Sequence, residues 1–225
     1  KFGGSSLADA KCYLRVAGIM KEYSQAGDMM VVSAAGSTTN QLISWLKLSQ
    51  SDRLAAHQVQ QSLRRYHTEL IGGLVEPAAA DTLIAAFIHD LERLAGLLDG
   101  GVSEAVYAEV VGHGEVWSAR LMAAVLNQLG MEAAWLDARA FLRAERAAQP
   151  QVDEGLSYPL LQQLMAQHPN KRLVVTGFIS RNQAGETVLL GRNGSDYSAT
   201  QIGALTGATR VTIWSDVAGL YCADR

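Results

Sequence analysis

Short β-prone runs that alternate with helix-like segments constrain the fold of this 225-residue chain more than any other feature. The β-prone runs cover residues 28–36, 132–138, 172–179, 186–191 and 208–216. Helix candidates lie between them, at 6–23 with Ser6 as a candidate N-cap, in several segments between 40 and 128, and at 195–207. Such alternation is typical of a mostly parallel sheet covered by helices on both faces. We therefore predict one α/β domain, a three-layer α/β/α sandwich with a mostly parallel central sheet.

Composition excludes several classes of function. The net charge of −3 supplies no basic surface for extended contact with nucleic acid. No apolar run approaches the roughly 18–20 residues of a membrane span, and no secretory signal is present. Cys12 and Cys222 lie far apart, and the five histidines are scattered, so no zinc or iron site held by protein side chains is expected. We predict a cytoplasmic protein without nucleic-acid or membrane partners.

Residues suited to binding small anions lie at the start of the chain and after the β-prone runs. The segments concerned are "KFGGSS", "SAAGSTTN", "TGFISR", "GRNGSDYS" and "SDVAGLY", which are rich in glycine, hydroxyl groups and single charges. In open α/β sheets, ligands bind beyond the carboxyl ends of the strands. The sequence therefore predicts a ligand site at one edge of the sheet.

The segment "GRNGSDYSA" (191–199) predicts a tight turn into a helix. Gly191, Asn193 and Gly194 permit positive φ angles, and the backbone N–H groups of such a turn can converge on an anion together with the helix N-terminus. Arg192 could hold a carboxylate through two parallel hydrogen bonds. Asp196 has two interpretations, an N-cap in a surface loop or a carboxylate that orients a cation such as Lys1 or handles magnesium.

The opening segment "KFGGSS" is either a flexible linker or a cradle for phosphate. Gly3 and Gly4 allow the backbone to approach an oxygen closely, and Lys1 can neutralise charge on a transferring phosphoryl group. The chain contains no GxxxxGK[ST], GxGxxG, HRD, DFG or GxSxG motif. P-loop enzymes, familiar dinucleotide-binding enzymes, protein kinases and esterases are therefore excluded. We favour the phosphate cradle.

The segment "GHGEVWSARL" (112–121) places Glu115 within a helical stretch. Either Glu115 is an ordinary solvated glutamate, or Gly112 and Gly114 thin the helix so that a small molecule can approach and Glu115 receives its ammonium group. Helical spacing assigns three neighbouring residues to the core, namely Trp117, Leu121 and Val125. The remaining tryptophans, Trp45, Trp135 and Trp214, are also assigned to packing.

Five segments taken in order resemble the motifs of aspartate kinases, members of the amino-acid kinase family. "KFGGSS" resembles their KFGG[TS]S opening, "VVSAAGSTTN" their VVSA-x-G-x-TN loop and "GHGEVWSARL" their GE-x-x-S helix. "GRNGSDYSA" and "WSDVAGLYCAD" resemble GRGGSDYSA and W[TS]DV-x-G[VIL]Y-x-xD. The resemblance covers residues 1–225 and implies the amino-acid kinase (carbamate kinase-like) fold. The helical middle and "GFISR" are most similar to the kinase portion of bifunctional aspartokinase–homoserine dehydrogenases of the methionine-linked type.

The resemblance also implies roles for individual residues. Lys1 would stabilise the transferring phosphate, and Asp196 would hold that lysine in position. Aspartate would be bound by Ser33, Thr39, Glu115, Phe178, Arg192 and Ser195, with Arg192 on a carboxylate and Glu115 on the amino group. The nucleotide would be bound by Gly3, Gly4, Ser5, Ser215, Asp216, Tyr221 and Asp224. Mg²⁺ would be held mainly by the phosphates of ATP and by water.

Three positions depart from the motifs of the family. Ser5 replaces the commoner threonine and keeps the hydroxyl group. Asn193 replaces a glycine, and because asparagine tolerates the left-handed conformation, we expect the turn to survive. The chain ends "YCADR" where the family has ADPR, which leaves the role of Arg225 open.

The resemblance implies transfer of phosphate from MgATP to the β-carboxylate of L-aspartate, the first step of lysine, threonine and methionine biosynthesis. It also implies a homo-oligomer, and a kinase domain that ends before further nucleotide contacts, regulatory domains and a homoserine dehydrogenase. Two alternatives remain at this point. One is another amino-acid kinase, acting on glutamate, acetylglutamate, carbamate or UMP, and the other is a ligand-sensing or assembly module without turnover.

Overall fold

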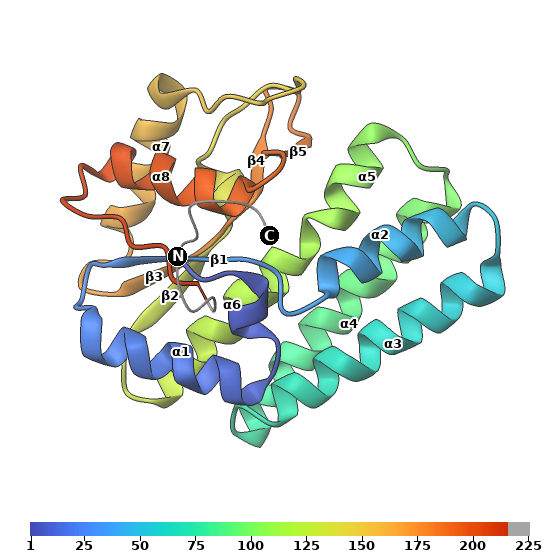
Figure 1. Ribbon diagram of the computed structural model, residues 1–225, viewed down its shortest axis with the longest axis horizontal. Coiled ribbons are helices and arrows are strands. Elements are labelled where there is room, and N and C mark those ends of the chain that lie inside the picture. The colour runs from blue at the N-terminus through green and yellow to red at the C-terminus, as the bar shows by residue number, and fades with distance from the viewer. Residues whose placement is uncertain (216–225) are drawn as a thin grey trace, which may run out of the picture.

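The computed structural model describes residues 1–215, which form three layers around a small parallel sheet. Helices α1 (Ala10–Tyr23) and α6 (His113–Gln128) lie on one side of the sheet. Helices α7 (Glu154–Ala166) and α8 (Gly194–Thr206) lie on the other side (Figure 1). The predicted three-layer α/β/α sandwich is therefore confirmed.

The sheet has the strand order β1-β3-β2. Strand β3 (Arg172–Thr176) is central and pairs in parallel with β1 (Met29–Val32) and β2 (Ala133–Leu136). Val175 is opposite Val31 on one side and Leu136 on the other. All three strands thus end at the same edge, where the sequence predicts a ligand site.

Both faces of the sheet are buried. Val174 of β3 belongs to the core on the α1 and α6 side, whereas Leu173 and Val175 pack with residues of α7 and α8. The alternation follows from the period of two residues in a strand, and burial on both faces is typical of parallel sheets. The buried face of α1 consists of Tyr13, Val16, Ala17 and Met20, at helical spacing.

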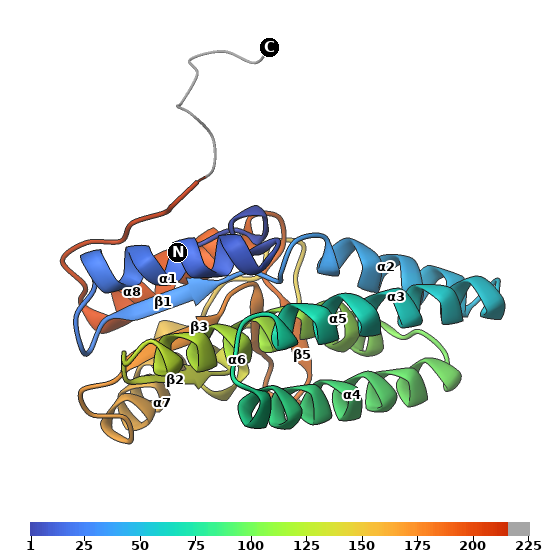
Figure 2. The ribbon, with the colours of Figure 1, turned by 90° about the horizontal axis from the view of Figure 1, so that it is seen from below.

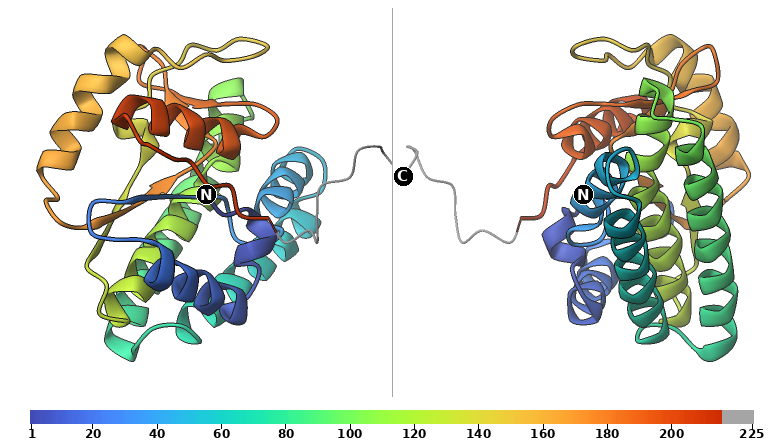
Figure 3. Two further views of the ribbon diagram at one scale, coloured as in Figure 1. Left: turned by 60° about the vertical axis from the view of Figure 1, so that its left-hand side comes forward. Right: turned by 90° about the vertical axis from the view of Figure 1, so that its right-hand side faces the viewer.

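Four helices extend beside α6 as an arm. They are α2 (Thr38–Ser49), α3 (Arg53–Gly72), α4 (Pro77–Asp99) and α5 (Glu104–Val111). Figures 2 and 3 show these helices packed against one another on the side of the molecule away from α7. Pro77 occupies the first turn of α4, where the missing N–H breaks no helical hydrogen bond.

A hairpin links the sheet to α8. Strands β4 (Ile179–Arg181) and β5 (Thr187–Leu189) pair antiparallel, and they follow β3 directly. Short 3₁₀ turns, η1 (Gly4–Leu7) and η2 (Ala138–Ala140), follow the first residues of the chain and β2. The hairpin places the turn at 191–193 beside the carboxyl end of β3.

Two of the predicted elements are corrected by the structure. Ser6 does not cap the first helix, because residues Gly4–Leu7 form η1 and α1 begins at Ala10. The N-cap is Asp9, whose carboxylate accepts a hydrogen bond of 2.8 Å from the backbone nitrogen of Cys12.

The second correction concerns the run 208–216, which forms no strand within the described residues. Trp214 makes an isolated parallel bridge to Phe2, and its nitrogen donates to the oxygen of Lys1 at 2.9 Å. The neighbouring segment turns into η1 at Gly4, so within the described residues the contact is limited to the bridge between Phe2 and Trp214. A run of β-branched residues is therefore not sufficient for a strand when its neighbour is this short.

The tryptophans differ in burial. Trp45 and Trp117 lie in the core, and Trp214 stacks on Phe2 with ring centroids 6.0 Å apart. Trp135 is 36% exposed, with the Arg120 guanidinium 4.8 Å from its ring centroid. Trp135 is thus more exposed than the other tryptophans assigned to packing, because it lies on an edge strand of the sheet.

Candidate active site

Lys1 and Asp196 form an ion pair at the carboxyl edge of the sheet. The Lys1 Nζ lies 2.6 Å from Oδ1 of Asp196, and their side chains are 11% and 39% exposed. Lys1 precedes Phe2, whose nitrogen donates to the oxygen of Val31 in β1, and Asp196 lies in the first turn of α8. The N-cap interpretation of Asp196 is wrong, since the N-cap position belongs to Asn193. The contact expected between Lys1 and Asp196 is present.

The glycines of the opening segment lie against the loop that follows β1. The nitrogen of Gly36 donates to the oxygen of Gly4 at 3.0 Å. A Cβ atom on Gly4 would lie 2.8 Å from the oxygen of Ala34, which is too close for any side chain. Gly3 precedes η1 as its N-cap residue, and Ser5 is exposed within η1. The opening segment is therefore built into the site and is not a linker.

The turn 191–194 has the expected left-handed residues at two of three positions. Gly191 has φ of 78°, and Asn193 has φ of 58° with ψ of 25°. Asparagine thus keeps the turn, as predicted. Gly194 has no positive φ; its role is close approach, since a Cβ there would lie 2.7 Å from Cδ2 of Phe178. Arg192 is exposed at the tip of the turn.

Two serines join the loop after β1 to the start of α8. The Ser33 hydroxyl donates to the Ser195 hydroxyl oxygen at 3.0 Å. Gly177, directly after β3, allows this approach because a Cβ there would lie 2.8 Å from Cβ of Ser195. Thr39 lies half-buried at the second position of α2. Segments far apart in sequence thus meet at one point, as the sheet topology predicts.

Phe178 holds an unusual backbone conformation beside this point. Its φ is 68°, which is rare for an aromatic residue and is typical of functional sites where the surrounding structure imposes it. Two hydrogen bonds hold the backbone of Phe178 in this conformation. Its nitrogen donates to the Ser198 hydroxyl oxygen at 2.9 Å, and its oxygen accepts from the nitrogen of Leu190 at 2.8 Å. Ser198 lies three residues after Ser195, and no sequence motif marks it as part of the site.

Glu115 is buried and incompletely paired. It lies in the first turn of α6 with 3% exposure, and its Oε2 has no hydrogen-bond partner among the described residues. Burial raises the pKa of Glu115 to about 8, against the opposing effect of hydrogen bonds from the backbone of Ala34 and of Glu115 itself. The interpretation of Glu115 as a solvated glutamate is wrong.

The glycines around Glu115 serve packing. A Cβ on Gly112 would lie 2.5 Å from Cγ2 of Ile179, and one on Gly114 would lie 2.7 Å from Cβ of Ala34. The expectation that these glycines thin the helix for a ligand is therefore wrong. They let α6 pack closely against β4 and the loop after β1, and this packing buries Glu115.

The nucleotide-side residues are only partly within the structure. Ser215 is exposed next to Trp214, which is bridged to Phe2. Asp216, Tyr221 and Asp224, together with Arg225, lie outside the described residues.

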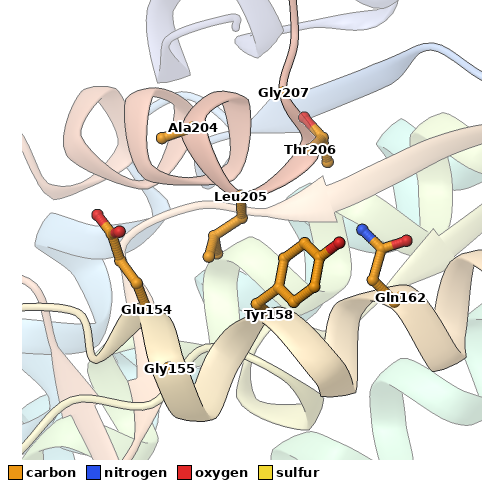
Figure 4. Close-up of a pocket in the computed structure, with 8 residues that line it drawn as sticks. All are labelled: Glu154, Gly155, Tyr158, Gln162, Ala204, Leu205, Thr206 and Gly207. Carbon is orange, nitrogen blue, oxygen red and sulfur yellow. The ribbon is translucent and has the colours of Figure 1, made fainter.

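Of two cavities among the described residues, one lies apart from this site and the other borders Lys1. One, of about 580 Å³, lies between α7 and α8 and includes Glu154 and Tyr158 in its lining (Figure 4). The other, of about 1030 Å³, runs between α1, β1, α8 and residues 208–214 and reaches Lys1 at one end. Glu115, Arg192 and Ser195 line neither cavity.

Within residues 1–215, no group of three or more His, Cys, Asp or Glu side chains could hold a metal ion. No helix in the same part of the chain has the length and apolar character needed to cross a membrane.

Comparisons with known proteins agree with the geometry. The chain is 82% identical over 224 residues to bifunctional aspartokinase/homoserine dehydrogenase 2 of Escherichia coli, covering all of this chain and 28% of that protein. It is 34% identical to an aspartokinase of Chlamydia pneumoniae, covering all of this chain and 48% of that protein. The crystal structure of E. coli aspartokinase III with aspartate and ADP superimposes with a TM-score of 0.88 at 27% identity, over 98% of this chain and 49% of that one.

The chain thus spans between about a quarter and a half of the length of these relatives. The sequence also matches the amino acid kinase family over residues 1–225, which is its whole length. The chain belongs to the amino acid kinase family.

Proposed function

We propose that this chain is the kinase part of an aspartate kinase. The β-carboxylate of L-aspartate attacks the γ-phosphorus of MgATP, an O–P bond forms, and the bond to the β-phosphate oxygen breaks, giving 4-phospho-L-aspartate and ADP. The observation that carries the proposal is the Lys1–Asp196 ion pair at the point where the loops after β1 and β3 meet the start of α8. The similarity to aspartokinases supports it.

Phosphoryl transfer requires mainly positioning and stabilisation of charge. The Lys1 ammonium is nearly buried and held by Asp196, so its charge is aimed without rearrangement during the reaction. Gly3 and Gly4 would add backbone N–H groups, since the first N–H groups of a helical turn have no partner within the turn. No nucleophilic side chain is needed, because the substrate carboxylate is itself the nucleophile.

Recognition of aspartate would use opposite charges at its two ends. The free Oε2 of Glu115 suits an ammonium group, which would supply the missing partner for a buried carboxylate. Arg192, exposed at the tip of the turn, would bind a carboxylate through two parallel hydrogen bonds. Four further residues would line the substrate, namely Ser33, Thr39, Phe178 and Ser195.

The nucleotide would lie on the other side of Lys1. Ser5 and Ser215 would contribute on that side, together with Asp216, Tyr221 and Asp224. Mg²⁺ would arrive as MgATP, held mainly by phosphate oxygens and water. Charge neutralisation of the phosphates is the chemistry that this ion supplies.

The relatives also support proposals about the whole protein. A homoserine dehydrogenase part would accompany this kinase, as the name of the E. coli relative states for that protein. We propose a cytoplasmic homo-oligomer that carries out the first step toward lysine, threonine and methionine.

The test is ADP release by the full-length protein with MgATP, with and without L-aspartate. We expect aspartate-dependent release that Asp196→Ala abolishes and that Asp81→Ala, on the exposed side of α4, retains. Glutamate, acetylglutamate, carbamate and UMP in place of aspartate should give little release. Faster release with one of these would transfer the assignment to another amino-acid kinase. Saturable nucleotide binding without release would indicate a module without turnover.

A further inference from the structure

Two neighbouring residues of α3, Tyr66 and His67, contact the two glycine-rich segments of the site from behind. The Tyr66 hydroxyl donates to the oxygen of Ala8, directly after η1, at 2.9 Å. The same hydroxyl would lie 3.0 Å from a Cβ on Gly36, in the loop after β1. The Tyr66 hydroxyl is therefore bonded to the residue that follows η1 and lies close to Gly36 in the loop that begins with Ser33.

His67 holds the far end of that loop. Its Nε2 lies 3.1 Å from Oγ1 of Thr38, the first residue of α2. The Thr38 hydroxyl donates to the oxygen of Ala35 at 2.6 Å, so its only proton is used and it accepts from the imidazole. Nε2 of His67 therefore carries a hydrogen.

The surroundings of His67 keep its imidazole in one protonation state. The side chain is 2% exposed, and the rings of Phe87 and Trp117 lie with centroids 4.9 and 5.0 Å away. Burial lowers the pKa of His67 to about 3, so the imidazole is neutral at physiological pH. The hydrogen bond from His67 to Thr38 is therefore made by the neutral imidazole and does not change with pH near neutrality.

The two segments touched by this pair are also bonded to each other. The nitrogen of Gly36 donates to Gly4, and the nitrogen of Ser33 donates to Phe2. The opening segment carries the groups proposed to bind phosphate. Residues 33–39 carry Ser33 and Thr39, which are proposed to bind aspartate. Their separation sets the distance between the two reacting groups.

We propose that Tyr66 and His67 are positioning residues that hold the phosphate segment (residues 3–8) and the aspartate segment (residues 33–39) at the separation needed for transfer. This inference rests on the proposed function. Neither residue touches the reacting atoms. Tyr66 acts through the backbone oxygen of Ala8, and His67 acts through the hydroxyl group of Thr38. Because a misplacement of about 1 Å can lower a rate about 10²-fold, loss of such a contact should act on kcat.

The first variant is Tyr66→Phe in the full-length protein, which removes only the hydroxyl group. We expect kcat to fall about tenfold while the KM values for aspartate and MgATP stay within about twofold. The amide of Gly36 should exchange its hydrogen about tenfold faster, because the segments separate more often. Tyr158→Phe, at a 52% exposed tyrosine on α7, is the matched control and should change neither quantity.

The second set tests the hydrogen bond of His67. His67→Leu and Thr38→Val should each lower kcat, and the double variant should be no worse than the more affected single one. His67→Gln keeps an N–H donor and should recover most of the activity lost in His67→Leu. His89→Gln, on the exposed side of α4, is the control. Losses that add in the double variant, or no recovery with glutamine, would overturn the role of His67.

The hydrogen-exchange measurement separates this inference from the proposed function. If the unchanged protein releases no ADP with aspartate, the proposed function fails, yet exchange still decides whether Tyr66 holds the two segments together. If the protein is active and Tyr66→Phe changes neither kcat nor exchange at Gly36, the positioning role is wrong.

Discussion

The two charged regions of the site differ in how their charges are balanced. On the phosphate side, Lys1 and Asp196 neutralise each other across 2.6 Å, and Asp196 keeps contact with solvent. On the aspartate side, Glu115 is buried in the first turn of α6, and its Oε2 has no hydrogen-bond partner among the described residues. One region is complete without ligand, and the other requires a cation for its charged form to be stable.

This difference indicates how each region would act. A preformed ion pair keeps the lysine in one position through the reaction, which is how electrostatic stabilisation lowers a barrier. A buried carboxyl group with a raised pKa instead couples binding to loss of a proton. The phosphate side should therefore control kcat, and the aspartate side should control affinity and its dependence on pH.

The largest expected effect is on the phosphate side. Lys1→Ala in the full-length protein should lower kcat by about 10²–10³, because one aimed positive charge is lost at the transferring phosphate. Steady-state ADP release measures this, with Lys11→Ala, an exposed lysine of α1, as the matched control. Near-normal turnover in Lys1→Ala would remove the distinction between the two regions.

On the aspartate side, Glu115→Gln should raise the KM for aspartate about 10- to 100-fold with a smaller change in kcat. Glutamine has nearly the same shape and keeps the packing, but it loses a hydrogen bond between charged groups, which contributes roughly 1.5–3 kcal/mol. The exposed Glu104→Gln in α5 serves as control. A drop in kcat without a change in KM would assign Glu115 to the chemical step instead.

Aspartate affinity should also depend on pH through Glu115. With a pKa of about 8, the ligand-free carboxyl group is mostly protonated at pH 7, whereas the ammonium group of aspartate requires it charged. Binding should therefore release close to one proton at pH 7, and affinity should rise about eightfold between pH 6.5 and 7.5. Calorimetry in buffers of different ionisation enthalpy counts the protons. Glu115→Gln should release none, and equal release in both proteins would contradict the prediction.

The two regions also differ in how far the sequence predicts them. The contact between Lys1 and Asp196 follows from the motifs that their two segments resemble, and the structure contains it. Lys1 lies beside β1 through Phe2, whereas Asp196 follows the β4–β5 hairpin, which is separate from the parallel sheet. The burial of Glu115 depends on how closely α6 packs against Ala34 and Ile179. No local pattern of residues predicts this packing.

The same limit applies to other parts of the fold. The amphipathic pattern of α3 marks His67 as a buried position but does not say that its ring meets Thr38, twenty-nine residues earlier. The β-branched residues at 208–216 favour a strand, yet among residues 1–215 the backbone contacts of this run are with Lys1 and Phe2, a neighbour of two residues. Local pattern thus predicts elements and faces, whereas the partner of each polar atom is set by the packed structure.

The smallest expected effect concerns Asn193, which lies between Arg192 of the aspartate side and Asp196 of the phosphate side. Asn193→Ala should lower the free energy of unfolding by about 1 kcal/mol, because alanine is strained at a φ of 58°. Asn170 is a matched control, since it has φ of 63° in the turn before β3, remote from the site. Asn170→Ala should lose similar stability in chemical denaturation without a kinetic change.

Asn193→Ala should in addition raise the KM for aspartate, because Arg192 shifts with the turn, while Asn193→Gly should leave both values nearly unchanged. A purely structural turn would give the same kinetic result for both asparagines.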